Sequence, residues 1–158
     1  MPRSLLGALS LLLALMPWPA GAQSDPLHNV REVKLTMAEP GEAARSCGLN
    51  RQALESAFFA PLAERGIRSV VSGTGYRLLL RTTTISYLEE SCVSYVEAKL
   101  LLTTRYQDSA NQQEQSGNVE LWANGGLYAS DRREHAASVE RAMRRLGGEF
   151  AQRWDAAN

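Results

Sequence analysis

Apolar and polar residues alternate along several stretches of the chain, and this two-residue period predicts β-strands. The longest such stretch is 92–106, where small and apolar residues from Cys92 to Leu102 share one face and a mixed set shares the other. Stretches of similar character are 30–38, 67–71, 76–86 and 118–122. The polar run 107–117 predicts a hairpin tip, and the Asn-Gly-Gly triplet at 124–126 is expected to end the last strand.

A helical period predicts a first helix over 50–66. Asn50 suits the N-cap position and Gly66 suits the C-terminal end of this helix. Pro61 removes a backbone donor, so we expect either a kink near Phe59 or two short helices. The preceding stretch 42–48, which carries the first cysteine, is expected to be a connection.

A second helix is predicted after Asp131, because Asp131 and Glu134 have the spacing of a capping box. Its apolar positions repeat at helical spacing and form one stripe: Ala136, Val139, Met143, Leu146, Phe150 and Trp154. Gly147 and Gly148 are expected to let this helix approach its neighbour closely, or to bend there.

These elements predict an α+β fold, an antiparallel sheet of about four to five strands with two helices packed on one face. The domain is expected to span 30–158 as a single unit, preceded by a flexible leader at 23–29. The chain carries 17 basic and 17 acidic residues, and a net charge near zero argues against nucleic acid as a partner.

Residues 1–22 have the pattern of a secretory signal peptide: a charged start at Arg3, an apolar run, and small residues before a cleavage site after Ala22. The protein is therefore expected to be exported, either periplasmic or secreted. The apolar run is too short for a transmembrane span, and no later stretch in the mature chain has that character.

Cys47 and Cys92 are the only cysteines, and in an oxidising compartment an even count favours a disulfide between them. A metal site is one alternative, but the only histidines, His28 and His135, have no ligand spacing around them. A redox pair is the other alternative, and it is more often a tight C-x-x-C. The sequence therefore favours a structural disulfide, with neither a metal nor a cofactor.

No catalytic group is apparent, and the chain is expected not to be an enzyme. There is no G-x-S-x-G motif, and His135 lies in the first turn of the last helix, where a surface position is ordinary. Three aromatic residues are instead candidates for a partner or ligand face on the side of the sheet without helices: Tyr87, Tyr95 and Trp122.

The chain has an N-terminal strand, a helix that ends in Leu-Ala-Glu-Arg-Gly-Ile at 62–67, a long hairpin and a C-terminal helix. In this pattern it resembles the N-terminal domain of the Tol-system translocation protein and the small lipoproteins of lipopolysaccharide assembly. It departs from those lipoproteins in having no cysteine after the predicted cleavage site. The resemblance implies adaptor work between proteins of the cell envelope.

The leading hypothesis is thus an exported, disulfide-stabilised binding or adaptor domain of the bacterial cell envelope whose partner is another envelope protein. The alternative hypothesis is a periplasmic carrier that holds a small apolar or lipid ligand between the helices and the sheet.

Overall fold

The computed structural model describes residues 25–87 and 90–158, and the predicted signal peptide lies outside them. In chain order the elements are β1 (Glu32–Met37), α1 (Glu42–Ser46), α2 (Arg51–Ala63), β2 (Arg68–Ser69), β3 (Tyr76–Tyr87), β4 (Ser91–Gln107), β5 (Glu114–Asp131) and α3 (Arg132–Ala157). The expected α+β order is confirmed. The expectation of a plain connection at 42–48 is wrong, because this stretch contains the short helix α1.

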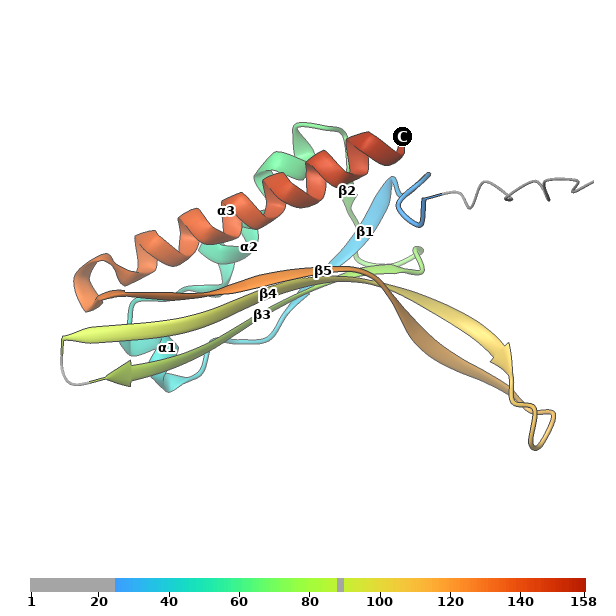
Figure 1. The fold of residues 1–158 in the computed structure, drawn as a ribbon, viewed down its shortest axis with the longest axis horizontal. Helices are drawn as coiled ribbons and strands as arrows, with labels where there is room; N and C mark the ends of the chain where they lie inside the picture. Colours follow the sequence, from blue (N-terminus) through green and yellow to red (C-terminus); the bar gives the residue numbers. More distant parts are fainter. Residues whose placement is uncertain (1–24, 88–89) are drawn as a thin grey trace, which may run out of the picture.

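The strands form one sheet in the order β2-β1-β3-β4-β5 (Figure 1). β1 lies parallel to both β2 and β3, whereas β3, β4 and β5 follow one another antiparallel. The prediction of an antiparallel sheet is therefore wrong in part, since the sheet is mixed. The chain travels from β1 to β2 through α1 and α2, and such a crossover returns it in the same direction.

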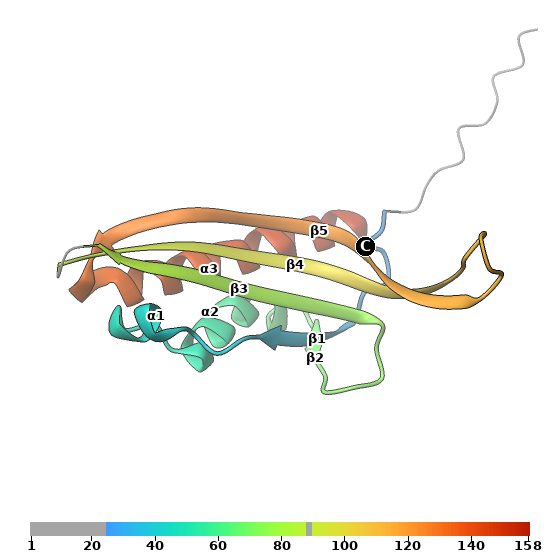
Figure 2. The ribbon, with the colours of Figure 1, turned by 90° about the horizontal axis from the view of Figure 1, so that it is seen from below.

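Helices α2 and α3 lie over one face of the sheet, which we call the covered face; the opposite face, the open face, has no helix from the described part of the chain in front of it (Figures 1 and 2). The strand periodicity sets which side chains point to each face. In β4 the buried residues alternate, as the sequence predicts: Cys92, Ser94, Val96, Ala98 and Leu100. They complete the core with the apolar stripes of α2 and α3.

Helices α2 and α3 approach each other closely at Gly147. A Cβ atom placed on Gly147 would lie 2.1 Å from the carbonyl oxygen of Phe58 in α2, so only glycine allows this spacing. Gly148 meets nothing within 4 Å. The predicted close approach is confirmed for Gly147, and it brings Phe58 and Phe150 into full burial.

Helix α2 begins as expected, with the Asn50 side chain accepting a hydrogen bond from the Ala53 amide at 3.1 Å. It then runs as a single helix, so the alternative of two short helices is wrong. Pro61 is tolerated because it lies in the last turn, where its missing N–H affects one backbone hydrogen bond near the end of the helix.

The start of α3 differs from the predicted capping box, because the Asp131 side chain makes no hydrogen bond to the helix. Asp131 is the last residue of β5 and pairs with Ser91 across the sheet. The amide of Arg132 continues this pairing by donating to the Glu90 carbonyl at 2.8 Å. Strand β5 therefore leads into α3 without a connecting loop, and pairing with β4 fixes the orientation of Asp131.

The hairpin of β4 and β5 is longer than the sequence predicts, and its tip projects beyond the rest of the domain (Figure 1). The expected end of the strand at 124–126 is wrong, because Asn124, Gly125 and Gly126 pair in register with β4. Neither glycine takes a positive φ, so both fit a strand. The one irregularity is a register shift between Leu100 and Leu101, which leaves Leu121 as an extra residue in β5.

The N-terminal residues that the structure describes are attached to the end of α3. Asp25 forms an ion pair with Arg153 at 2.6 Å, and the Trp154 indole donates to the Val30 carbonyl at 2.6 Å. Leu27 is buried, with 1% of its surface exposed. Within the stretch expected as a leader, Leu27 thus contributes to the core at this end of the domain.

Candidate functional site on the open face of the sheet

The open face carries a group of apolar side chains from β3, β4 and β5. Ile85 pairs with Val93, which pairs in turn with Ala129, and in the next row Tyr95 pairs with Leu127. With the residue at the end of β3 they form what we call the open-face patch: Ile85, Tyr87, Val93, Tyr95, Leu127 and Ala129.

Four side chains of this patch are strongly exposed: 60% for Ile85, 63% for Tyr87, 40% for Tyr95 and 70% for Leu127. Single exposed apolar residues are normal on protein surfaces, but a contiguous group marks an interaction surface. Covering each of these side chains would contribute on the order of 1–2 kcal/mol, by the usual scale for burial of an apolar side chain.

A charged network borders the open-face patch. The Lys99 ammonium lies 3.2 Å from a carboxylate oxygen of Glu97 and 3.2 Å from one of Glu120. Hydrogen bonds to Glu120 and then Glu97 raise the pKa of Lys99. An apolar centre next to a paired polar border is the usual arrangement of a protein–protein interface.

The structure places two of the three aromatic candidates on this face. Tyr87 and Tyr95 lie on the open face, as their strand positions imply. Trp122 does not: it pairs with Leu100 and packs edge-on against Phe150, with ring centroids 5.1 Å apart, on the covered face. The prediction that Trp122 shares the open face is wrong because Trp122 belongs to the apolar contact between β5 and α3.

Four members of the patch are not among the predicted aromatic residues: Ile85, Val93, Leu127 and Ala129. Ile85 stands in a threonine-rich strand and pairs with Val93, so the alternation in β3 carried the signal. Leu127 and Ala129 lie beyond the two glycines at which the strand was expected to end. The available signal was the two-residue spacing of Gly125, Leu127 and Ala129, which continues the strand period beyond the glycines.

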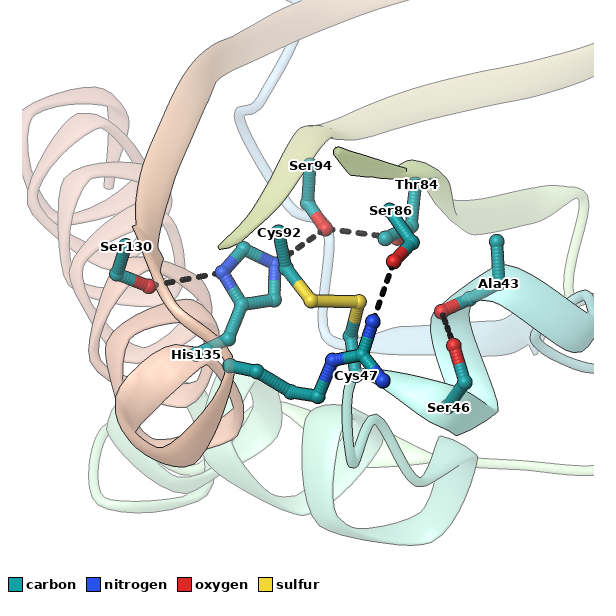
Figure 3. The surroundings of a disulfide bond; sticks show 10 residues. Ala43, Ser46, Cys47, Thr84, Ser86, Cys92, Ser94, Ser130 and His135 are labelled. Carbon is teal, nitrogen blue, oxygen red and sulfur yellow. Dashed lines mark hydrogen bonds between the residues drawn. A yellow bond between two sulfur atoms is a disulfide. The ribbon is translucent and has the colours of Figure 1, made fainter. Parts of the chain in front are cut away.

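The predicted disulfide is confirmed: Cys47 at the end of α1 is bonded to Cys92 in β4, with a Cα–Cα distance of 6.1 Å (Figure 3). Both cysteines are fully buried. Since each sulfur is bonded to the other, neither is free to bind a metal ion. Within 25–87 and 90–158, no group of three or more His, Cys, Asp or Glu side chains could hold one.

A buried polar network lies beside this disulfide (Figure 3). The His135 Nε2 atom is 2.7 Å from the Ser94 hydroxyl, which is 2.7 Å from the Thr84 hydroxyl. The Nδ1 atom of His135 is 2.8 Å from the Ser130 hydroxyl. A surface position for His135 is therefore wrong: the first turn of α3 faces the sheet, and the imidazole is fully buried.

The pairing of Ser94 with His135 has the distance of a nucleophile and its base, but its surroundings differ from those of a catalytic pair. Both residues have 0% exposed surface, and a substrate in solution has no access to them. Burial lowers the pKa of His135, which favours the neutral ring that donates through one nitrogen and accepts through the other. The network thus provides hydrogen-bond partners for both ring nitrogens of His135 and for the Ser94 hydroxyl.

The region between helices and sheet, where a carrier would hold its ligand, is filled by large side chains. The fully buried residues there include Phe58, Phe150, Leu80, Leu100 and Leu146. The surface hollows of the described residues are lined mainly by polar and charged side chains; one of about 420 Å³ is lined by Glu90, Asp131, Arg132 and Arg133. The open-face patch is therefore the stronger candidate site.

In the part of the chain that the structure describes, no helix combines the length and the apolar character needed to cross a membrane.

Comparison with known proteins gives structural likeness alone. No family model and no curated protein sequence matches the chain. Among solved structures, a PelC dodecamer from Paraburkholderia phytofirmans aligns with 16% identity over 77% of this chain and 86% of that chain, at a TM-score of 0.47. A minor lipoprotein from Acinetobacter baumannii aligns with 9% identity over 82% and 93%, at a TM-score of 0.41.

A lipoprotein from Caulobacter crescentus aligns with 16% identity over 79% of this chain and 87% of that chain, at a TM-score of 0.31. These likenesses assign neither a site residue nor an activity to this chain.

Proposed function

We propose that this protein is an exported, non-catalytic binding domain of the cell envelope that attaches to another envelope protein through the open-face patch. Export rests on the signal-peptide pattern of residues 1–22. The Cys47–Cys92 disulfide supports an oxidising compartment. The observation that carries the proposal is the contiguous apolar surface on three strands, with its border of paired charges.

The partner is expected to present an apolar segment, because the side chains to be covered are aliphatic or aromatic. Ile85 and Leu127 are the most exposed aliphatic residues of the patch, and they come from different strands. The hydroxyl groups of Tyr87 and Tyr95 allow the same surface to make polar contacts at its margin. A partner that covers only one strand would leave much of the patch exposed.

Affinity capture from the host's own envelope extract tests this proposal, with Ile85→Arg and Leu127→Arg as disruptive variants. Val71→Arg is the matched control, because Val71 is 87% exposed and lies in the connection between β2 and β3, outside the patch. We expect one captured protein that is lost with both patch variants and retained with the control.

Capture of no protein above background would contradict the proposal, and so would a partner that binds all four forms equally. Native mass spectrometry of the same preparation examines the carrier alternative. A small apolar adduct that remains bound to Ile85→Arg and Leu127→Arg would favour the carrier over the adaptor.

A further inference from the structure

Strand β5 is the last strand of the sheet on its side, and its outer edge faces solvent (Figure 2). Among residues 25–87 and 90–158, no strand pairs with that edge. The other end of the sheet is different, because β2 contains only two residues. A long unpaired edge is a template for another strand, and proteins usually protect such edges.

The usual protective features are absent from the sequence of β5 next to the body of the domain. From Leu121 to Ser130 there is neither a charged residue nor a proline. The register shift at Leu121 lies at one end of this stretch, so 122–131 pairs regularly with β4. This segment is therefore able to accept a partner strand along its whole length.

The backbone groups available for pairing belong to the odd-numbered residues of this segment. The amide of Arg132, an even-numbered residue, donates to the Glu90 carbonyl, next to the start of β4. The amide of Gly125, an odd-numbered residue, donates instead to the Asn124 side chain at 2.7 Å. Because the two directions alternate along an antiparallel strand, the N–H and C=O groups of Ala123, Gly125, Leu127 and Ala129 point outward.

The side chains that α3 extends over β5 show which partner fits. Arg145 lies over the Tyr128 ring, 5.7 Å from its centroid, and Glu149 accepts a hydrogen bond from Asn124. Within the same helix the Arg145 guanidinium also pairs with the Glu149 carboxylate at 3.7 Å. A positive charge thus stands at the level of residue 128 and a negative charge at the level of residue 124. An antiparallel copy of β5 centred on Gly126 places residue 128 opposite residue 124. The two Arg145–Glu149 pairs then run in opposite directions, and each Arg145 lies beside the other copy's Glu149 as well as its own.

We propose that the partner of this edge is a second copy of the chain, with β5 paired antiparallel to β5 in a register centred on Gly126. In this register Leu127 lies opposite the partner's Gly125, a large residue beside a small one. Ala123 lies opposite the partner's Ala129, and no like charges are opposed. The Gly125 amide exchanges its bond to Asn124 for one to the partner's Leu127 carbonyl. The two open-face patches become neighbours on one continuous sheet.

Disulfide trapping with two single-cysteine variants, Ala123→Cys and Ala129→Cys, tests the register. A hydrogen-bonded antiparallel pair has a Cα separation of about 5.5 Å, which suits a disulfide. In the proposed register residue 123 lies opposite the partner's residue 129, which is six positions along the strand from the partner's residue 123. The two copies of residue 123 would therefore be about 20 Å apart. Under mild oxidation we therefore expect covalent dimer from the mixture and little from either variant alone. A mixture that gives no more dimer than the separate variants would overturn the proposal.

Sedimentation velocity of the purified mature protein tests the dimer itself. Ala129→Pro removes an outward N–H that makes no bond to β4, so it should abolish the dimer, while the control Ala129→Val keeps that N–H and should retain it. A wild-type protein that is monomeric at high micromolar concentration, or a dimer that survives in a folded Ala129→Pro variant, would overturn the proposal. If that variant does not fold, the trapping experiment decides.

This dimer does not depend on the proposed adaptor function. Ile85 lies on β3, two strands away from the edge, so Ile85→Arg should leave the dimer intact while it abolishes capture. Failure of one proposal is therefore distinguishable from failure of the other.

Discussion

Two adjacent glycines in α3 give a prediction in which the same substitution has opposite effects on stability. In Gly147→Ala the new methyl group would lie 2.1 Å from the Phe58 carbonyl oxygen, about 1.3 Å short of the 3.4 Å at which ordinary contact begins. The obstacle is backbone in the middle of α2, so a side-chain rotation cannot relieve it. In Gly148→Ala the new methyl group meets nothing within 4 Å.

Relief of the clash in Gly147→Ala requires α2 and α3 to separate, which loosens the packing around Phe58 and Phe150. Overpacking of a core commonly costs about 1–3 kcal/mol. We expect a net loss near the upper end, about 2–3 kcal/mol, after the gain in helix propensity. Gly148→Ala has only that gain, up to about 1 kcal/mol, and should stabilise the protein.

Urea unfolding of the oxidised mature chain measures both free energies of unfolding, provided that the m-value stays constant. In thermal unfolding, the loss in Gly147→Ala corresponds to a fall in Tm of roughly 6–12 °C for a domain of this size. Equal effects of the two substitutions, or a Gly147→Ala protein as stable as wild type, would refute the close approach of the two helices.

Three further predictions concern the other contacts described above. Burial lowers the pKa of His135 from the ordinary 6.5, so the unfolded chain binds a proton more readily than the folded protein. The free energy of unfolding should be constant above neutral pH, fall as the pH drops below about 6.5, and level off below the folded-state pKa. Urea unfolding across this range should show that the His135→Gln variant lacks this pH-dependent loss of stability. Replacement of Cys47 and Cys92 by serine should cost about 4 kcal/mol, measured as the loss in the free energy of unfolding, because the bond joins residues 45 positions apart. A loss below about 1 kcal/mol would contradict this estimate for the disulfide. Trp154→Phe removes the hydrogen bond to Val30 and should cost about 1 kcal/mol, with faster hydrogen exchange at 25–30 and unchanged exchange in β4 as the control.

Most of the fold is predictable from the sequence because its elements have strong local signals. The alternation through β4 and the apolar stripe of α3 each identify an element and the face that it buries. The mixed sheet is not predictable in this way. The position of β1 between β2 and β3, parallel to both, depends on tertiary pairing. The few apolar residues of a six-residue strand do not show which strands will lie beside it or in which direction.

The candidate site was predictable only in part, and the reason lies in β5. Two adjacent glycines ordinarily interrupt a strand, yet Gly125 pairs with Glu97 and a Cβ there would lie 2.6 Å from the Val96 carbonyl oxygen. The glycine is thus required by close backbone approach within the sheet rather than by a turn. That requirement is invisible in the sequence, and it concealed Leu127 from the predicted patch.

The attachment of residues 25–30 to the end of α3 has a consequence for biogenesis. Asn158 donates to the Leu27 carbonyl and accepts from the Asn29 amide, contacts that join positions 131 and 129 residues apart. During synthesis or translocation, residues 25–30 must therefore wait for residues 153–158 before they can dock. A chain that ends before residue 153 lacks every one of these contacts, and its residues 25–30 would stay accessible to proteases.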